Sequence, residues 1–295
     1  MVPGIKSTFS ADGVSFNMIS VPGGLTFPTG FYNDGPDATV ANAYLIGETE
    51  VTYELWYKVY TWAIANGYTF ANPGREGKLG INGAAPTAAK NQPATFVSWR
   101  DAIVFGNALT EWYNAKAGTA YTLAYYSDAA YTIPIKTSSD DEMMCATAGC
   151  IDDPYVKADA TGFRLPTTHE WELAARYKDG TDWTPGNYAS GATAPYTDAL
   201  ATQLVDWYSL NSSNVTHDVK GKLPNALGLY DMSGNVWEWN FEYRNPNDIV
   251  HDWCRLIRGG SWRWADYMQV GNANDGATAW FAYHEVGFRF VKTDL

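Results

Sequence analysis

The sequence predicts a single α+β domain with few helices, short strands and many loops. Three stretches repeat apolar residues at helical spacing directly after a helix-capping side chain, and short runs rich in β-branched and aromatic residues are typical of strands. From about residue 179 onward, irregular segments with many glycine and asparagine residues predominate. No linker separates halves of different composition, so we expect one domain over residues 1–295.

The strand patterns begin near the N-terminus. Residues 16–21 predict a strand, a Pro-Gly-Gly turn follows it, and residues 25–27 return from that turn as a second short strand. Another strand is expected at residues 43–48. Two shorter strand-like stretches occur at residues 121–123 and 131–133.

Each predicted helix starts at a side chain that can cap its first turn. The helices are expected near residues 52–66, 98–116 and 168–176. Thr52 and Ser98 are good N-cap residues, and Thr167 with Glu170 has the spacing of a capping box. Gly118 stops the second helix. The stretch between the first two helices is rich in Gly, Ala, Pro and Asn and predicts a long surface loop at 68–93.

Composition and charge argue against several classes of function. The chain has 32 acidic and 20 basic residues and a formal net charge of −12. An acidic chain repels phosphate backbones, so nucleic acid is not expected as a partner. No apolar stretch approaches about 18 residues, so no membrane span is expected, and residues 1–4 lack the pattern of a signal peptide. The 13 Trp, 20 Tyr and 12 Phe residues fit either a large aromatic core or a binding surface.

The three cysteines are too few for a disulfide framework. Cys145 and Cys150 lie in a loop of small residues, where a short disulfide is one possible arrangement. As a zinc site the same pair would need two further ligands. Cys254 takes part in neither arrangement.

Several long motifs resemble the formylglycine-generating enzyme (sulfatase-modifying factor) family. They are FRLPTTHEWELAAR at 163–176, NALGLYDMSGNVWEW at 225–239, RGGSW at 258–262 and GFRF at 287–290. The shorter pieces GETEVT and VSWRDA precede them in the order that the family uses, so the resemblance extends from about residue 16 to the end. It implies an elaborated C-type lectin fold, which is an α+β domain with a small twisted antiparallel sheet and a loop-rich half.

The chain departs from this family in the residues that carry its chemistry. In the oxidase members two cysteines follow the GGS motif as GGS-x-x-C-x4-C, and they bind copper and activate oxygen. The matching positions here are Trp264 and Gln269, which cannot become thiolates. The three-histidine iron site of the ergothioneine-type branch has no HxxxHxE counterpart among the four histidines. We therefore do not expect an enzyme.

A calcium site is expected in the turn around residues 233–235. Asp231 and Glu238 flank this turn, and two carboxylates on an irregular backbone can converge with carbonyl oxygens as Ca²⁺ requires. The resemblance implies that the side chains of Asp231 and Glu238 and the backbone oxygens of Gly234 and Val236 hold the ion. The alternative is that both acids accept hydrogen bonds from loop amides and no ion binds.

The stretch between Trp262 and Gly287 has neither helical nor strand periodicity. It combines aromatic residues with small polar ones, a composition typical of antibody paratopes. It resembles the variable proteins of diversity-generating retroelements, in which adenine-containing codons of a C-terminal lectin-fold segment are randomised. The resemblance implies a variable ligand-binding region at about 262–286 that contains Arg263, Trp264, Asp266, Tyr267, Asn272, Asn274, Asp275, Trp280, Phe281, Tyr283 and His284. The alternative is that these aromatic residues pack beneath loops.

The leading interpretation is a non-enzymatic binding protein on a bacterial cell surface or outer membrane. It would act as a monomer on an unknown protein or cell-surface ligand, and a lipid anchor outside this chain would hold it there. The first alternative is an oxidoreductase of the sulfatase-modifying factor family with a relocated active site. The second is a structural accessory lipoprotein that uses the fold as a spacer.

Overall fold

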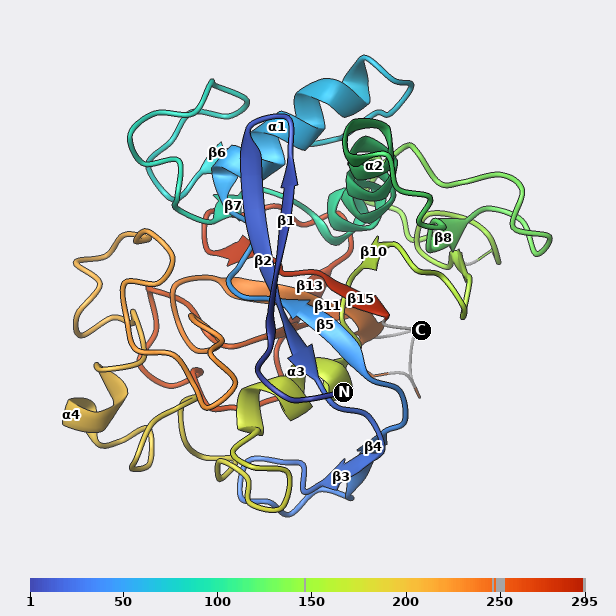
Figure 1. The fold of residues 1–295 in the computed structure, drawn as a ribbon. Coiled ribbons are helices and arrows are strands. Elements are labelled where there is room, and N and C mark those ends of the chain that lie inside the picture. Colours follow the sequence, from blue (N-terminus) through green and yellow to red (C-terminus); the bar gives the residue numbers. More distant parts are fainter. Residues whose placement is uncertain (146, 246, 248–252, 294–295) are drawn as a thin grey trace.

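The computed structural model describes residues 1–145, 147–245, 247 and 253–293. Its central element is a five-stranded antiparallel sheet with the order β1-β2-β5-β15-β10 (Figure 1). These strands are β1 (Lys6–Ala11), β2 (Val14–Val21), β5 (Tyr44–Gly47), β15 (Val291–Thr293) and β10 (Phe163–Arg164). The last strand of the chain thus lies between strands from the N-terminal and the middle parts.

A second sheet has the order β13-β12-β11-β14. Its strands are β11 (Trp237–Tyr243), β12 (Cys254–Arg258), β13 (Gly276–Thr278) and β14 (Val286–Gly287). β12 pairs with β11 in antiparallel fashion and β14 pairs with its other edge in parallel. Both ends of the 262–286 segment are therefore fixed to the same strand.

Three further pairs of short strands lie in the loops. They are β3 (Leu25–Phe27) with β4 (Ala38–Val40), β6 (Arg75–Glu76) with β7 (Ala94–Thr95), and β8 (Tyr125–Tyr126) with β9 (Tyr155–Val156). β6 lies inside the stretch 68–93 that the sequence predicts as a long loop, and β7 follows directly after it.

The helices agree closely with the sequence prediction. They are α1 (Tyr53–Ile64), α2 (Trp99–Ala117), α3 (Thr168–Arg176) and the single turn α4 (Ala199–Thr202), which was not predicted. Thr52 caps α1, and Ser98 and Thr167 each form a capping box. Gly118 ends α2 with a φ of 71°, a left-handed conformation that favours glycine.

Two hydrophobic cores lie on opposite faces of the five-stranded sheet. Side chains alternate between the faces of a strand, so Met18 of β2 packs into the core that contains α1 and α2, whereas its neighbour Ile19 packs into the core that contains α3. Leu45 and Ile46 of β5 divide in the same way. Figure 1 shows α1 and α2 together at one end of the molecule and α3 towards the other. Many of the large aromatic residues, including Trp56 and Trp171, are buried in these cores.

Several strand predictions are wrong. Residues 121–123 and 131–133 are not strands, and the nearby strand is β8 at 125–126. Tyr131 has a φ of 56°, which a β-strand does not tolerate. Residues 25–27 do form β3, but this strand pairs with β4 instead of returning along β2.

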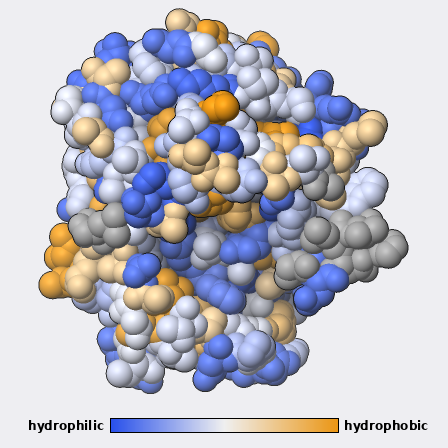
Figure 2. Space-filling model, turned by 90° about the vertical axis from the view of Figure 1, so that its right-hand side faces the viewer, coloured by the Kyte–Doolittle hydropathy of each residue, from blue (hydrophilic) through white to orange (hydrophobic). Residues whose placement is uncertain are grey.

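The structure decides between the two arrangements of the cysteines by joining Cys145 and Cys150 in a disulfide. The loop that carries it is also held by a buried ion pair, in which Arg100 Nε and Nη2 donate to the two carboxylate oxygens of Asp152 at 2.7 and 2.6 Å. None of the helices in the described part of the chain has the length and hydrophobicity needed to span a bilayer. Figure 2, which views the molecule from the right-hand side of Figure 1, shows polar and apolar residues intermixed on that face.

The N-cap of α2 provides a test of local stability. Ser98 is fully buried, and its Oγ accepts from the Asp101 amide at 3.1 Å while donating to the Asp101 carboxylate at 2.8 Å. Ser98→Ala is expected to lower the free energy of unfolding by about 1–2 kcal/mol in urea titrations. Ser10→Ala, on the exposed side of β1, serves as the control and should change it by less than about 0.5 kcal/mol. Equal effects of the two substitutions would contradict the assigned role of the cap.

Candidate ligand-binding face and buried acidic centre

Two glycines and a buried tryptophan lead from β12 into the 262–286 segment. Gly259 and Gly260 have φ values of 92° and 77°, and a Cβ on Gly260 would meet the backbone of Tyr267 at 2.9 Å. Trp262 is buried, and its amide donates to the carbonyl oxygen of Asn235 at 2.9 Å. The segment therefore leaves the sheet from a fixed starting point.

Beyond Trp262 the aromatic side chains gather and reach the surface. Trp264 and Phe281 are 41% and 39% exposed. The ring centroids of Trp264 and Tyr267 are 6.0 Å apart, and those of Phe281 and Tyr283 are 5.6 Å apart. Tyr283 in turn lies 3.9 Å from the ring of His284. The structure thus brings together five of the residues that the sequence predicts for ligand binding.

Glu285, near the end of the segment, contacts residues at the beginning of the segment. Its buried carboxylate accepts from the indole Nε1 of Trp264 at 3.2 Å and from the hydroxyl of Ser261 at 3.1 Å, and it pairs with Arg263 at 3.4 Å. Arg263 is exposed and belongs to the same surface as Trp264. The exposed aromatic side chains are therefore held in place by a polar contact beneath them.

Other predicted site residues lie apart from these rings. Trp280 is half-buried and faces the guanidinium of Arg100, with 5.3 Å between the Arg100 Cζ atom and the ring centroid. Asn272 donates to the carboxylate of Asp275 at 2.9 Å and accepts from the Asn274 amide at 3.1 Å, so these three residues form a turn that leads into β13. The remaining predicted residue, Asp266, is exposed, and its carbonyl oxygen accepts from Gln269 Nε2 at 2.8 Å.

Three residues outside the predicted region complete the surface. The Cζ atom of Arg75 lies 3.9 Å from the ring centroid of Phe96, and Phe96 stacks on His284 at 6.4 Å. The Nζ atom of Lys78 lies 4.0 Å from the ring centroid of Trp262. Burial lowers the pKa of His284, and the charges of Lys78, Arg263 and Arg75 lower it further. We use the name "aromatic face" for the set Arg75, Lys78, Phe96, Trp262, Arg263, Trp264, Tyr267, Phe281, Tyr283 and His284.

The second feature is a buried acidic centre around β11. Glu238 is fully buried, and its two oxygens accept from Arg289 Nε and Nη2 at 2.7 and 2.6 Å. Trp171 Nε1 donates to the same carboxylate at 2.7 Å. Arg289 also donates to the carbonyl oxygens of Gly47 and Tyr230 at 3.0 and 2.9 Å. The arginine of the GFRF motif thus forms an internal ion pair with Glu238.

Beside this ion pair lie further buried carboxyl groups with unpartnered oxygens in the described part of the chain. Within the described residues, both oxygens of Glu50 and the Oδ1 atom of Asp231 are buried and have no hydrogen-bond partner. Burial raises the pKa of Asp231 to about 6, with the charge of Glu238 adding to it. Burial, followed by the charges of Asp231 and Glu238, raises the pKa of Glu50 well above its usual range. Both oxygens of Asp206, a fully buried neighbour of Asp231, are also unpartnered.

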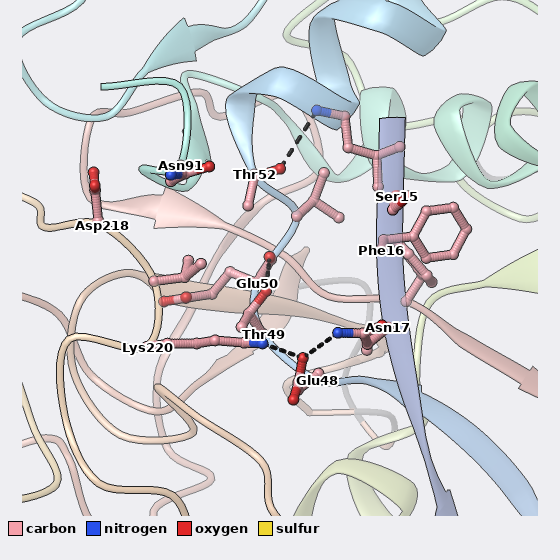
Figure 3. Close-up of a pocket in the computed structure, with 15 residues that line it drawn as sticks. Ser15, Phe16, Asn17, Glu48, Thr49, Glu50, Thr52, Asn91, Asp218 and Lys220 are labelled. Atoms are coloured by element: carbon pink, nitrogen blue, oxygen red, sulfur yellow. Dashed lines mark hydrogen bonds and ion pairs between the residues drawn. The ribbon is translucent and has the colours of Figure 1, made fainter. Parts of the chain in front are cut away.

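The acidic centre is close to solvent on one side. Glu50 lines a pocket of about 320 Å³ together with Glu48, Asp218 and Lys220 (Figure 3). In this pocket Glu48 accepts from Asn17 Nδ2 at 2.7 Å and is paired with lysines, whereas Glu50 has no such partner. Glu50 is therefore the member of the centre through which the pocket and the buried carboxylates are connected.

The predicted calcium ligands are arranged around this centre. The charges of Asp231 and Glu238 act on each other, and the φ of 74° at Gly234 turns the backbone between them. A Cβ on Gly234 would meet a carboxylate oxygen of Asp206 at 1.5 Å, so only glycine fits there. In the part of the chain that the structure describes, no three His, Cys, Asp or Glu side chains converge closely enough to hold a metal ion by themselves. An ion here would depend on backbone oxygens as well.

The fold is the formylglycine-generating-enzyme type of C-type lectin fold, and comparisons with known proteins identify the family. The family model described as "Sulfatase-modifying factor enzyme 1-like domain" matches residues 8–294. The chain therefore belongs to this family.

Three individual proteins illustrate the range of its relatives. The structure of Treponema denticola variable protein 1 is similar to this chain with a TM-score of 0.73 and 30% identity, covering 98% of this chain and 99% of that one. Chaperone protein LppX of Paenibacillus barcinonensis is 27% identical over 276 residues, which are 87% of this chain and 82% of that protein. The inactive C-alpha-formylglycine-generating enzyme 2 of Mus musculus is 30% identical over 122 residues, which are 34% of this chain and 32% of that protein.

Proposed function

We propose that this chain is a non-enzymatic protein that binds a protein or cell-surface ligand, as a monomer, through the aromatic face. The observation that carries the proposal is the exposure of Trp264 and Phe281 on a segment held at both ends by β11. Exposed aromatic groups on a rigid scaffold are typical of interaction sites. The similarity over nearly the whole chain to a variable protein supports the same reading.

We propose further that a retroelement diversifies residues 262–286 and that the protein is displayed on the cell surface through an anchor outside this chain. The support is that several of the exposed side chains project from a loop whose ends are fixed, so that substitutions there need not disturb the cores. The test is the nucleotide sequence around the gene. A nearby repeat of this segment that differs only at adenines is expected, and its absence from the complete genome would refute the diversification.

The aromatic face gives a direct test of binding. Trp264→Ala and Phe281→Ala are each expected to weaken binding by about 2 kcal/mol or more, which is roughly 30-fold in Kd, because central aromatic groups are typical hot spots. The free energy of unfolding should change by less than about 1 kcal/mol, since both side chains are substantially exposed. Binding is measured by titration with a peptide selected on the wild-type protein.

Tyr32→Ala is the control for this test. Tyr32 is 71% exposed and lies outside the aromatic face, so its removal should leave Kd unchanged. If all three variants bind equally well, or if Trp264→Ala unfolds the domain, the assignment of the binding face is wrong.

No formylglycine-generating activity is expected. Trp264 and Gln269 stand where the oxidase members have cysteines, and neither side chain forms a thiolate that could hold copper. Gln269 is buried at 1% exposure. Incubation with a sulfatase-type cysteine peptide, with and without copper, should produce no aldehyde by mass spectrometry while an active formylglycine-generating enzyme assayed in parallel does.

Measurable turnover in that assay would favour the first alternative, an oxidoreductase with a relocated site. An accessory lipoprotein that acts as a spacer is the second alternative, and it would bind no ligand through the aromatic face. The LppX relative is named as a chaperone protein, and chaperone action is a further form of non-enzymatic binding.

We also propose that the acidic centre holds a structural Ca²⁺ ion. Asp231 and Glu238 would bind it through their carboxylates and Gly234 and Val236 through their carbonyl oxygens, with Glu50 as an additional ligand. The unpartnered oxygens of Glu50 and Asp231 support this, because these two carboxyl groups are buried beside Glu238, whose carboxylate is already paired with Arg289. A bound divalent cation would compensate the excess charge and fix the turn at 233–235.

A further inference from the structure

The aromatic face concentrates positive charge on a protein whose net charge is −12. Arg75, Lys78 and Arg263 all lie close enough to act electrostatically on His284. Arg263 is paired with Glu285. For Arg75 and Lys78 the described residues provide no carboxylate within 4.0 Å, so these two cations are not neutralised.

Aromatic rings fix the positions of these two cations. Arg75 stacks on Phe96, Phe96 on His284, His284 on Trp262, and Lys78 on Trp262, with separations between 3.9 and 6.4 Å. Cation–π contacts orient a charge without cancelling it. The resulting row of alternating rings and cations is preorganised before any ligand arrives.

Part of the hydrogen-bonding capacity of this row is unused. Arg75 Nε donates to Asn82 at 2.8 Å and Nη1 donates to the carbonyl oxygen of Lys78 at 3.5 Å, whereas Nη2 has no partner within the described chain. Lys78 Nζ donates to the carbonyl oxygen of Asn214 at 2.5 Å, which leaves its two other hydrogens available. These donors suit the planar oxygens of a carboxylate.

The backbone at Phe96 supports a functional role for the same row. Phe96 has a φ of 55°, a left-handed conformation that a bulky residue adopts only under constraint. Its amide donates to the carbonyl oxygen of Tyr283 at 3.0 Å, which links β7 to the 262–286 segment. Strain of this kind concentrates at binding and catalytic sites.

We propose that the aromatic face recognises an acidic protein segment, in which Arg75 and Lys78 bind one or two carboxylates and Trp264 and Phe281 contact a neighbouring apolar side chain. This inference rests on the proposed binding function. It adds that the preference for acidic ligands resides outside residues 262–286. Substitutions within that segment would then change which acidic ligand binds and leave the preference for acidic ligands intact.

The test begins with a random 12-residue peptide library on phage, selected on the immobilised wild-type protein. Asp and Glu are expected to be enriched at least about twofold over the unselected library. Three selected peptides are then synthesised, and their Kd values are measured by fluorescence anisotropy. Replacement of their acidic residues by Asn and Gln is expected to raise Kd by about tenfold or more.

The matched variants have the same net charge. Arg75→Gln/Lys78→Gln and Lys157→Gln/Lys178→Gln each remove two positive charges, so the net charge changes from −12 to −14 in both. The first should raise Kd about tenfold, whereas the second should change it less than about twofold, because Lys157 and Lys178 lie outside the aromatic face. Thermal unfolding of all variants shows whether the fold is retained, and Lys78→Gln alone is the fallback if Arg75 proves necessary for folding.

The outcomes separate this inference from the proposed function. Selection of peptides that lack acidic residues would overturn the inference and leave the binding function standing. The same holds if the peptides bind Arg75→Gln/Lys78→Gln as tightly as wild type but bind Trp264→Ala more weakly. Binding of dextran sulfate that depends on Arg75 and Lys78, with no acidic peptide selected, would overturn the choice of a protein ligand. If no peptide and no sulfated polymer binds, both proposals fail.

Discussion

Replacing Arg289 by methionine is expected to lower the free energy of unfolding by about 3–5 kcal/mol, because it leaves the fully buried carboxylate of Glu238 without its counter-charge. The loss also removes the hydrogen bonds to the carbonyl oxygens of Gly47 and Tyr230, which connect the two sheets. Urea unfolding at pH 7 measures the effect. A change below about 1 kcal/mol would show that this ion pair does not stabilise the fold.

Two further variants show whether Arg289→Met destabilises the protein through the uncompensated charge or through lost packing. Lys136→Met breaks a half-exposed pair with Glu111 and should cost less than about 1 kcal/mol, since exposed ion pairs contribute little. Glu238→Gln/Arg289→Met should be more stable than Arg289→Met, because it no longer buries an uncompensated charge. If the double variant is the less stable one, the cost comes from lost packing and not from charge.

Removal of Ca²⁺ is expected to lower the thermal midpoint by roughly 6–12 °C, which corresponds to about 3 kcal/mol of binding free energy at an ion concentration a few hundred times Kd. Differential scanning calorimetry with EDTA and with added CaCl₂ measures the shift. Glu50→Gln should abolish the response to Ca²⁺ and raise the midpoint in EDTA, since it removes a buried carboxyl group whose oxygens have no hydrogen-bond partner in the described chain. Glu48→Gln, which alters the neighbouring carboxylate in the same pocket, should retain the response.

The ion-free protein should also depend on pH through Asp231. The pKa of Asp231 is raised from 3.8 to about 6 in the folded state, so the folded state binds this proton more tightly than the unfolded state does. The folded state therefore gains stability as the pH falls from about 6 to 4, by roughly 3 kcal/mol, and lacks this contribution above about pH 6. The difference between wild type and Asp231→Asn in EDTA isolates this effect. A difference that does not vary between pH 4 and 7, or a midpoint that neither EDTA nor CaCl₂ moves, would contradict the proposal of a cation site.

The helices could be predicted because their signals are local. Thr52, Ser98 and Thr167 cap the helices from within three residues, and Gly118 ends one by its own conformation. Strand pairing depends on distant partners instead, so the sequence could not show that β3 pairs with β4 or that residues 6–11 form an edge strand.

The candidate site could be predicted only where one segment carries it. The exposed residues Trp264 and Phe281 follow from the composition of 262–286, but Arg75 and Phe96 join them through β6 and β7, whose two-residue length gives no periodicity. The sequence equally could not distinguish Glu48 from Glu50. Glu48 pairs with Lys6 and Lys220, whereas Glu50 faces the acidic centre, and only the path of the chain after β5 determines this.

The position of β15 has a consequence for synthesis of the protein on the ribosome. Val291 pairs with Ile46 and Lys292 with Phe163, so the five-stranded sheet cannot be completed until residues 291–293 have been synthesised. The 244 residues between Ile46 and Val291 take on the order of tens of seconds to translate, and during that time the edge of β5 remains open to pairing with other chains. A nascent chain of this architecture needs protection from aggregation until residues 291–293 emerge, and a stop codon before residue 291 would leave that edge open permanently.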